Sequence, residues 1–290
     1  MGQVRSNRPR PPLPAWIAAP VAMGAFAVLV WLELRHPLRR EVESKVTRNA
    51  RNLAVAALGA VTLQLSETPA VKLLTQVVER RGWGLVKRVG APFWLEVALT
   101  IVLLDYTLYI WHILTHRAPW LWRFHLVHHV DLDMDASTAL RFHFGELAWS
   151  VLWRSAQVVV IGVSPFAYSL WQTALVLLIL FHHSNVRLPD AVERRLSRLL
   201  ITPRLHGIHH SIVESEINSN WSSGLSIWDR LHGTLRMNSR DREVTVGVPA
   251  YRDPRELTLP KILKMPFGPQ RDPWPPLRDD GGPALSPTAP

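Results

Sequence analysis

Apolar stretches long enough to cross a membrane alternate along this chain with tight clusters of histidine. A bilayer core takes about 20 apolar residues per helix. The stretches predict five crossings or deep insertions, at residues 16–34, 52–74, 92–115, 147–162 and 166–182. The last two are short, so a hairpin that enters only one leaflet is an alternative. The fold class that follows is an all-α integral membrane protein with about four to five transmembrane or membrane-inserted helices.

The histidines are concentrated in one part of the chain, because eleven of the thirteen fall between residues 112 and 210. The clusters are His112-x3-His116 followed by His125-x2-His128-His129, then the pair His182-His183, and then His206-x2-His209-His210. Imidazole is the commonest metal ligand in proteins. Adjacent helical residues point about 100° apart, so the two copies of H-x2-H-H predict a site for more than one metal ion.

Composition removes several classes of site and partner. The chain has no cysteine, which excludes disulfides, iron–sulfur clusters and thiolate-bound metals and leaves histidine and carboxylate as the strong ligands. The net charge of +10 would suggest nucleic acid on a soluble protein. Here much of the Lys and Arg flanks apolar stretches, which favours the positive-inside effect. We therefore expect a membrane and no nucleic acid.

The order of the stretches predicts that all histidine clusters lie at one membrane face. The chain leaves and returns on the same side between Leu147 and His182, with a turn at Gly162 to Pro165. The basic loop 35–51 falls on that face, which makes it cytoplasmic, although loop 75–91 is also basic. We expect a histidine-rich helical cap that faces the cytoplasm on a bacterial inner membrane, with the lipid entering between helices 92–115 and 147–182.

One acidic residue lies inside an apolar stretch beside the first cluster. Asp105, Tyr109, His112 and His116 share one helical face. A buried carboxylate in a membrane helix usually marks a functional site. Asp105 is therefore predicted to orient a ligand imidazole through the ring N–H that the metal does not use. A bond to a neighbouring hydroxyl or a buried arginine is the alternative.

The histidine-rich part resembles the fatty acid hydroxylase superfamily, also called the sterol desaturase family, from about Asp105 to Arg236. The segments that carry the resemblance are DYTLYIWHILTH, WRFHLVHH, ALRFHFGE, FHHSN, ITPRLHGIHHS and NWSSGLSIWDRLHGT. FHHSN selects His183 over His182. The chain departs from the family where His232 replaces a usual Phe and where Trp221-Ser222 replaces an aromatic–Gly pair, which puts substrate fit or cap packing in doubt.

The resemblance implies a membrane-embedded non-haem di-iron oxygenase that hydroxylates or desaturates a lipid, such as a sterol or a fatty acyl chain. Two Fe ions would be the cofactor and O2 the co-substrate. Oxidation of unactivated C–H bonds needs a redox metal, since no side chain supplies that chemistry. The chain has no G-x-G-x-x-G fingerprint. We therefore expect a separate electron donor, a ferredoxin or a cytochrome with its reductase, that docks on basic loops 35–51 and 187–204.

The resemblance also implies roles for individual residues. The expected metal ligands are His112, His116, His125, His128, His129, His183, His206, His209 and His210, with His143 as a tenth ligand or a donor that supports one. Glu146 would orient an imidazole or relay protons, with a salt bridge to Arg141 as the alternative. Asn185 would hold a water or a ligand histidine. His182 is expected to face away, Asp229 to pair with an arginine, and His36 to be solvated.

The sequence also predicts a division into four parts. Residues 1–15 form a disordered basic tail, and residues 16–91 hold the N-terminal membrane helices and basic loops. Residues 92–240 are the fatty acid hydroxylase-like catalytic domain. Residues 241–290 form a Pro-rich extension that is disordered from residue 266.

Two other function classes remain open. A zinc-dependent hydrolase at the membrane would use an open coordination position and a base such as Glu146. A metal-binding or transport protein would place its ligands near the midplane of the membrane. The histidines follow helix ends instead, which disfavours transport.

Overall fold

A computed structural model of the chain describes residues 10–237 and 244–275. Within these ranges the chain is helical and has no β-strand, only three isolated antiparallel bridges. The longer helices are α1 (Ala15–Arg35), α2 (Lys45–Leu65), α3 (Glu67–Arg81), α5 (Phe93–Arg117), α6 (Pro119–His129), α7 (Phe144–Gln157) and α8 (Pro165–His183). The all-α prediction is confirmed.

Short helices fill the connections and the C-terminal part. They are α4 (Leu85–Val89), η1 (Thr138–Leu140), η2 (Val158–Gly162, a π-helical turn), α9 (Asp190–Leu196), α10 (Pro203–His209), α11 (Glu214–Ile217), α12 (Ile227–Leu231), η3 (Pro249–Tyr251), η4 (Pro254–Glu256), α13 (Leu259–Lys264) and η5 (Met265–Phe267).

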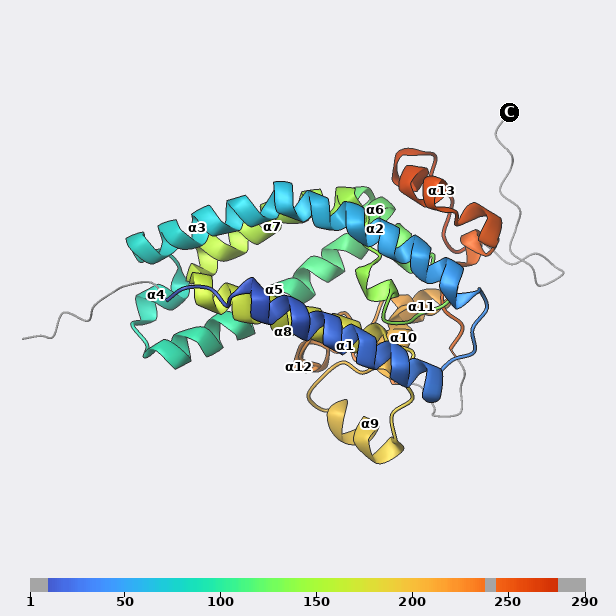
Figure 1. Ribbon diagram of the computed structural model, residues 1–290, viewed down its shortest axis with the longest axis horizontal. Helices are drawn as coiled ribbons and strands as arrows, with labels where there is room; N and C mark the ends of the chain where they lie inside the picture. The colour runs from blue at the N-terminus through green and yellow to red at the C-terminus, as the bar shows by residue number, and fades with distance from the viewer. Residues whose placement is uncertain (1–9, 238–243, 276–290) are drawn as a thin grey trace, which may run out of the picture.

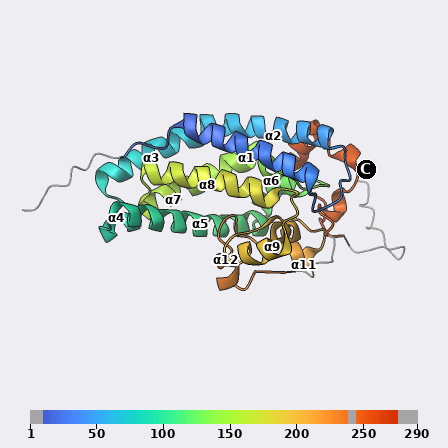
Figure 2. The ribbon, with the colours of Figure 1, turned by 60° about the horizontal axis from the view of Figure 1, so that its bottom comes forward.

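The long helices lie side by side along the longest axis of the molecule, and α9, α10, α11 and α13 gather toward one end (Figures 1 and 2). We call this end the cap. Helix α1 packs against α8, α2 against α7, and α5 against both α7 and α8. Helices α1, α5 and α8 finish at the cap, whereas α2 and α7 begin there. Helices α7 and α8 therefore form a hairpin that begins and ends at the cap.

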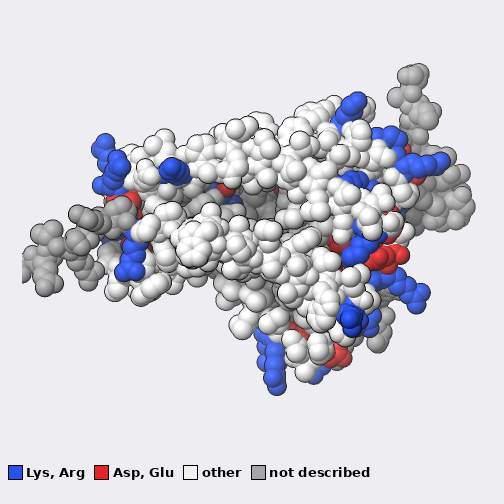
Figure 3. Space-filling model, viewed as in Figure 1, with Lys and Arg blue, Asp and Glu red and all other residues white. Residues whose placement is uncertain are grey.

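Four helical segments among the described residues are long and apolar enough to cross a membrane: α1, Lys45–Val89, α5 and α8. The predicted fifth stretch, 147–162, is helical as α7 and η2 but is not one of the four. Helix α7 has only 14 residues and carries Glu146 and Arg154. In Figure 3 the charged side chains gather at the two ends, and the middle of the visible face is almost uncharged. Such an apolar belt is what a bilayer core requires.

Local sequence sets the helix starts that place the histidines. The side chains of Ser164 and Thr202 accept hydrogen bonds from the first turns of α8 and α10, and a proline follows each of them. Both features are typical of helix N-termini. Gly162, with φ of 90°, ends η2 before α8 begins. The predicted turn is therefore confirmed.

The C-terminal extension packs on the cap. A buried apolar cluster joins Val55 of α2 and Leu126 of α6 to Leu257 and Ile262 of the extension. Beyond η5, the indole Nε1 of Trp274 donates to the carbonyl of Ile212 at 3.0 Å. Disorder was predicted for 1–15 and from 266 onward. Residues 10–15 and 266–275 have described positions, and residues 1–9 and 276–290 lie outside the described part of the chain.

Candidate metal centre

Nine of the ten predicted ligand histidines lie together at the cap. They form two groups, and within each group one possible ligand atom from every residue lies within 4.8 Å of all the others. The first group is His112, His116, His125, His129 and His209. The second is His128, His183, His206 and His210. Eight of the nine rings are classed as buried, and His116 is half-buried.

Adjacent histidines belong to different groups. His128 faces the second group and His129 the first, and His209 and His210 divide in the same way. This follows from the angle of about 100° between neighbouring helical side chains. Histidines four residues apart, such as His112 and His116, share a group instead. The prediction that H-x2-H-H serves two metal positions agrees with this geometry.

The outer ring nitrogens of several histidines are held by hydrogen bonds. Nδ1 of His112 contacts the carbonyl of Trp221 at 2.6 Å, Nδ1 of His183 contacts that of Ile179 at 2.8 Å, and Nδ1 of His209 contacts that of Ser219 at 2.8 Å. A carbonyl only accepts, so in each ring Nδ1 carries the proton and Nε2 has a free lone pair. This arrangement fixes a ring for metal binding.

The inner nitrogens lie at distances that suit shared metal ions. Nε2 of His183 is 3.0 Å from Nε2 of His128 and 3.0 Å from Nε2 of His206. In the first group, Nε2 of His125 and Nε2 of His129 are 3.2 Å apart. Zinc–imidazole bonds are about 2.0–2.1 Å long. Two nitrogens on one such ion therefore lie about 2.9–3.4 Å apart, so the donor set fits metal ions.

Unsatisfied nitrogens point to the same conclusion. The Nε2 atoms of His116, His209 and His210 are buried and have no hydrogen-bond partner in the described structure. Buried polar atoms are rarely left in this state unless an ion or water completes them. Burial and the neighbouring imidazoles lower the pKa of the cap histidines His128, His129, His206, His209 and His210. These rings are therefore neutral near pH 7, as metal ligands must be.

A buried carboxylate supports one ligand. Oε1 of Glu146 accepts from Nδ1 of His125 at 3.0 Å. This is the predicted orienting role, and the alternative salt bridge with Arg141 is absent among the described contacts. Arg141 donates instead to the carbonyl of Val127 and to Asn52. Oε2 of Glu146 is buried and has no hydrogen-bond partner among residues 10–237 and 244–275.

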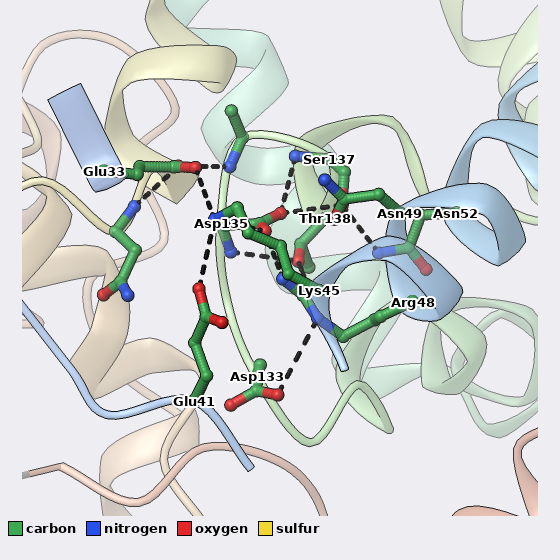
Figure 4. A network of polar contacts seen from close by, with 12 residues as sticks. Glu33, Glu41, Lys45, Arg48, Asn49, Asn52, Asp133, Asp135, Ser137 and Thr138 are labelled. Carbon is green, nitrogen blue, oxygen red and sulfur yellow. Dashed lines mark hydrogen bonds and ion pairs between the residues drawn. The ribbon is translucent and has the colours of Figure 1, made fainter. Parts of the chain in front are cut away.

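A network of charged side chains fixes the loop after α6 (Figure 4). Arg48 of α2 is buried and contacts Asp131, Asp133 and Asp135. Burial alone would raise the pKa of Asp131, but Arg141 and Arg48 outweigh it and hold that pKa below its usual range. Asp131 follows His129 by two residues, so the network holds the end of α6 and with it both metal groups.

The same network reaches the end of α8. Oε1 of Glu33 in α1 accepts from the backbone N–H groups of Ala136 and Asn185 at 2.8 and 2.9 Å. The Asn185 side chain exchanges two hydrogen bonds with the backbone of Arg39. Asn185 was predicted to hold a water or a ligand histidine. It joins the α1–α2 connection to the residues after His183 instead.

Asp105 also has partners other than the predicted imidazole. Its Oδ2 accepts from the backbone N–H of Leu225 at 3.1 Å and from Nε1 of Trp228 at 2.7 Å. Asp229 accepts from the backbone N–H groups of Trp221 and Ser222 and shows no arginine partner among the described contacts. Both carboxylates therefore fix residues 221–228, the segment that covers the first group. The Trp221 carbonyl in this segment holds His112.

Four histidines lie outside both groups: His36, His143, His182 and His232, whose Nε2 lies 3.2 Å from the Tyr106 hydroxyl. His143 caps α7: its Nδ1 accepts from the N–H of Gly145 at 2.9 Å, and its Nε2 faces the Leu263 carbonyl at 3.1 Å. Both nitrogens are thus engaged away from the two groups. His182 is predicted to face away from the metals and belongs to neither group; it is buried, with its ring centroid 4.1 Å from that of His206. His36 is exposed, as predicted.

An apolar cavity of about 310 Å³ leads away from the histidines. Five ligand candidates line its inner end: His112, His125, His128, His183 and His206. Beyond them the walls come mainly from α2, α5, α7 and α8, with side chains such as Leu63, Leu108, Leu147, Leu175 and Ile179. The arrangement can hold a hydrocarbon chain against the two metal groups and away from water.

Sequence reasoning did not identify several residues that shape the site. The alternating acids Asp131, Asp133 and Asp135 directly follow a histidine cluster, which was a usable signal. Trp221 is fully buried, with its ring centroid 4.6 Å from that of His116. Its only sequence signal was the departure from the family pattern at Trp221-Ser222.

The central part of the chain matches a known family. The family model described as fatty acid hydroxylase matches residues 97–234. This range contains both groups of histidines, Glu146 and the segment that covers the first group. No solved structure matches the chain.

The names of the similar curated proteins refer to different lipids. The chain is 34% identical over 158 residues to an ornithine lipid hydroxylase of Rhizobium tropici, which covers 54% of the chain and 46% of that protein. It is 27% identical to cholesterol 25-hydroxylase of Homo sapiens, with 50% and 52% covered. It is 31% identical to alkylglycerol monooxygenase of Xenopus tropicalis, with 47% and 30% covered. The chain thus spans about half the length of the first two relatives. It spans less than a third of the length of the third.

Proposed function

We propose that this chain, whose residues 97–234 form a fatty acid hydroxylase domain, is a membrane-embedded non-haem di-iron oxygenase that hydroxylates or desaturates a lipid. One observation carries the proposal: two groups of buried imidazoles adjoin the inner end of an apolar cavity. A hydrocarbon in that cavity would meet the metal positions directly. The names of the similar proteins, which are hydroxylases and monooxygenases of lipids, support the same class of reaction.

Nine histidines would hold the two ions, in the two groups described above. An all-imidazole donor set without thiolate suits iron, zinc or copper. Zinc is redox-inactive and could not supply the oxidation of C–H bonds by O2 that side chains cannot perform. Iron is proposed over copper because of the resemblance to the fatty acid hydroxylase family. In hydroxylation one oxygen atom enters the C–H bond and the other leaves as water, which consumes two electrons and two protons.

The residues of the chain orient the ligands and handle protons. The carbonyls of Trp221, Ile179 and Ser219 hold three rings with Nε2 directed at the metal positions. Glu146 holds His125 through Oε1. Its Oε2 has no described hydrogen-bond partner, and because the side chain lines the cavity, Oε2 would be the atom that carries a proton for the reaction. Asp105 and Asn185 would support the ligands indirectly. Asp105 fixes the segment 221–228, and Asn185 joins the α1–α2 connection to the end of α8.

The electrons would come from a separate protein of the ferredoxin or cytochrome type. The exposed Arg187, Arg194, Arg195 and Arg198 around α9 offer a basic surface for an acidic donor. The stretch 35–51, which was also predicted to dock the donor, would contribute less to this surface, because Lys45, Arg48 and Arg51 are paired with acids. Arg39 is likewise engaged, with the carbonyls of Pro203 and Ser184.

The proposed setting is a bacterial inner membrane with the cap in the cytoplasm. The hollow in the uncharged face of Figure 3 lies between α2–α3 and α1–α8, and it favours lipid entry there instead of between 92–115 and 147–182. The division of the chain into four parts, with boundaries at residues 16, 92 and 241, stays a prediction. The proposed catalytic domain of 92–240 contains the family match.

Metal and product analysis test the proposal together. We expect protein purified without metal supplementation to carry two irons per chain. With a reductase system and isotopically labelled O2, it should place labelled oxygen in a lipid extracted from the host membrane, or introduce a double bond. Stoichiometric zinc that persists under iron supplementation, with hydrolytic turnover, would support the membrane zinc hydrolase instead.

A further inference from the structure

A cluster of polar side chains lies in the apolar interior at the end of the cavity remote from the histidines. Glu67 of α3, Arg154 of α7 and Gln172 of α8 all line the cavity there. Nε of Arg154 lies 3.8 Å from Oε1 of Glu67, which accepts from the hydroxyl of Tyr168 at 2.7 Å. Nη1 of Arg154 donates to Gln157 at 2.6 Å. Acidic and basic atoms are also visible at the bottom of the hollow in Figure 3.

Two atoms of this cluster are buried without a hydrogen bond to any described residue. They are Nε of Arg154, which can only donate, and Oε1 of Gln172, which can only accept. Leaving such atoms unsatisfied is costly, and native structures usually complete them with a ligand or water. Both belong to side chains that line one cavity, so a single small polar group can serve both.

We propose that this cluster binds a hydroxyl group of the lipid substrate. The inference rests on the proposed function and adds the class of substrate: a neutral lipid that carries a hydroxyl. A hydroxyl donates one hydrogen bond and accepts others, so it satisfies Gln172 Oε1 and Arg154 Nε together. A plain alkane would leave both atoms unsatisfied.

The charge of the cluster disfavours an anionic group at the same place. Glu67 and Arg154 are opposite charges in a buried setting and balance each other. A carboxylate or phosphate would add a third charge without a partner, which is costly in a membrane interior. The outer hollow beyond the cluster is different, because it shares Glu67 and Gln172 but is also lined by Arg10, Lys72 and Arg80. An anionic head group would have to reach those residues.

The position of the cluster predicts where the lipid is oxidised. Gln172 lies eleven residues before His183 on α8, and Arg154 lies eight residues after Glu146 on α7. At 1.5 Å per helical residue these separations are roughly 16 and 12 Å. A bound hydroxyl would therefore hold the reacting carbon at a set distance. The oxidised position should be counted from the hydroxyl and not from the methyl end.

Binding is tested first, because it does not depend on turnover. Purified full-length protein in detergent would be mixed with 1-hexadecanol, hexadecane or hexadecanoate, and the shift in thermal unfolding temperature measured. We expect the alcohol to stabilise the protein most. Gln172→Leu should remove the advantage of the alcohol over the alkane. Gln64→Leu is the matched control, since Gln64 is exposed and lines only the outer hollow. Equal hexadecane shifts in both variants show that they are folded.

Product position is tested second, with 1-alkanols of increasing length under turnover conditions. We expect oxidation at the same carbon counted from the hydroxyl throughout the series, and scattered positions in Gln172→Leu. Equal shifts with alcohol and alkane, a larger shift with hexadecanoate, or positions counted from the methyl end would each overturn the inference. Selective alcohol binding without oxidation by any donor would support the subsite and count against the oxygenase. Oxidation that ignores the hydroxyl would leave the oxygenase standing without the subsite.

Discussion

The Nδ1 atom of His125 lies 3.0 Å from Oε1 of Glu146, and both side chains are buried. The carboxylate therefore fixes the His125 ring with Nε2 directed at the first metal group. Its other oxygen, Oε2, has no partner among the described residues and belongs to a side chain that lines the cavity. One side chain thus links a candidate ligand to the place where the lipid would react.

Glu146→Gln separates the two roles of this carboxylate. Glutamine keeps an acceptor for His125 Nδ1 but loses the negative charge and the capacity to carry a proton. We expect the variant still to bind metal at saturating iron. We expect its turnover to fall by about 10–100-fold, the usual effect of changing a group that supports a metal ligand. Metal analysis and product formation measure the two properties. Glu214→Gln, on an exposed side chain of α11, should change neither. Full turnover in Glu146→Gln would remove Glu146 from the site.

One histidine from each group tests whether the groups act as a pair. We expect His128→Ala and His209→Ala each to lose most of the bound metal and all turnover, because every ring in a group contributes to one compact donor set. Elemental analysis and the lipid oxidation assay are the measurements. His36→Ala is the control, since His36 is exposed and far from both groups in the chain. Full metal content in either variant would contradict the assignment.

His143 should matter for stability and not for metal. Its Nδ1 caps α7, and its Nε2 faces a backbone carbonyl. His143→Ala should keep both metal ions and lower the free energy of unfolding by about 1 kcal/mol, a typical cost of losing a helix cap. His143→Asn should recover much of that loss, because asparagine is a good N-cap. Loss of one ion in His143→Ala would return His143 to the ligand set.

The helices and the two groups of histidines could be predicted because their signals are local. Apolar length marks the long helices, and the spacing of His112 and His116 places both on one helical face. Divergence of His128 and His129 into two groups also follows from helix geometry alone. The family resemblance then separated His183 from His182, whose spacing does not distinguish them.

The residues that join distant segments could not be predicted in the same way. Arg48 belongs to the basic stretch 35–51, which the sequence analysis takes as a loop, and nothing near it in the sequence shows that it is buried in α2 against Asp131 and Asp135. Asp105 was expected to contact an imidazole, but its partner Trp228 comes from a segment more than a hundred residues later. Which polar partner a side chain finds depends on which distant segments the fold brings next to it. The local sequence pattern does not contain that information.

Arg48→Met tests the ion network in Figure 4. Methionine fills much of the volume but leaves Asp131 and Asp135 buried with less compensating charge. We expect a loss of roughly 3–5 kcal/mol in the free energy of unfolding, as found when one partner of a buried ion pair is removed. Denaturant unfolding in detergent measures it. Arg35→Met, at an exposed arginine near the end of α1, should have little effect. An equal effect of the two changes would mean that the network does not stabilise the cap.

The orientation of the cap can be tested directly because the native chain has no cysteine. Ala191 on α9 is exposed near the cap, and Val89 at the end of α4 is 64% exposed near the opposite end of the long helices (Figure 1). With the cap in the cytoplasm, a membrane-impermeant thiol reagent added to intact cells should label Val89→Cys and spare Ala191→Cys. Opening the membrane should expose both, and the unchanged chain should stay unlabelled. The reverse pattern would place the histidines outside the cytoplasm. Labelling of both positions in intact cells would mean that the long helices do not cross the membrane.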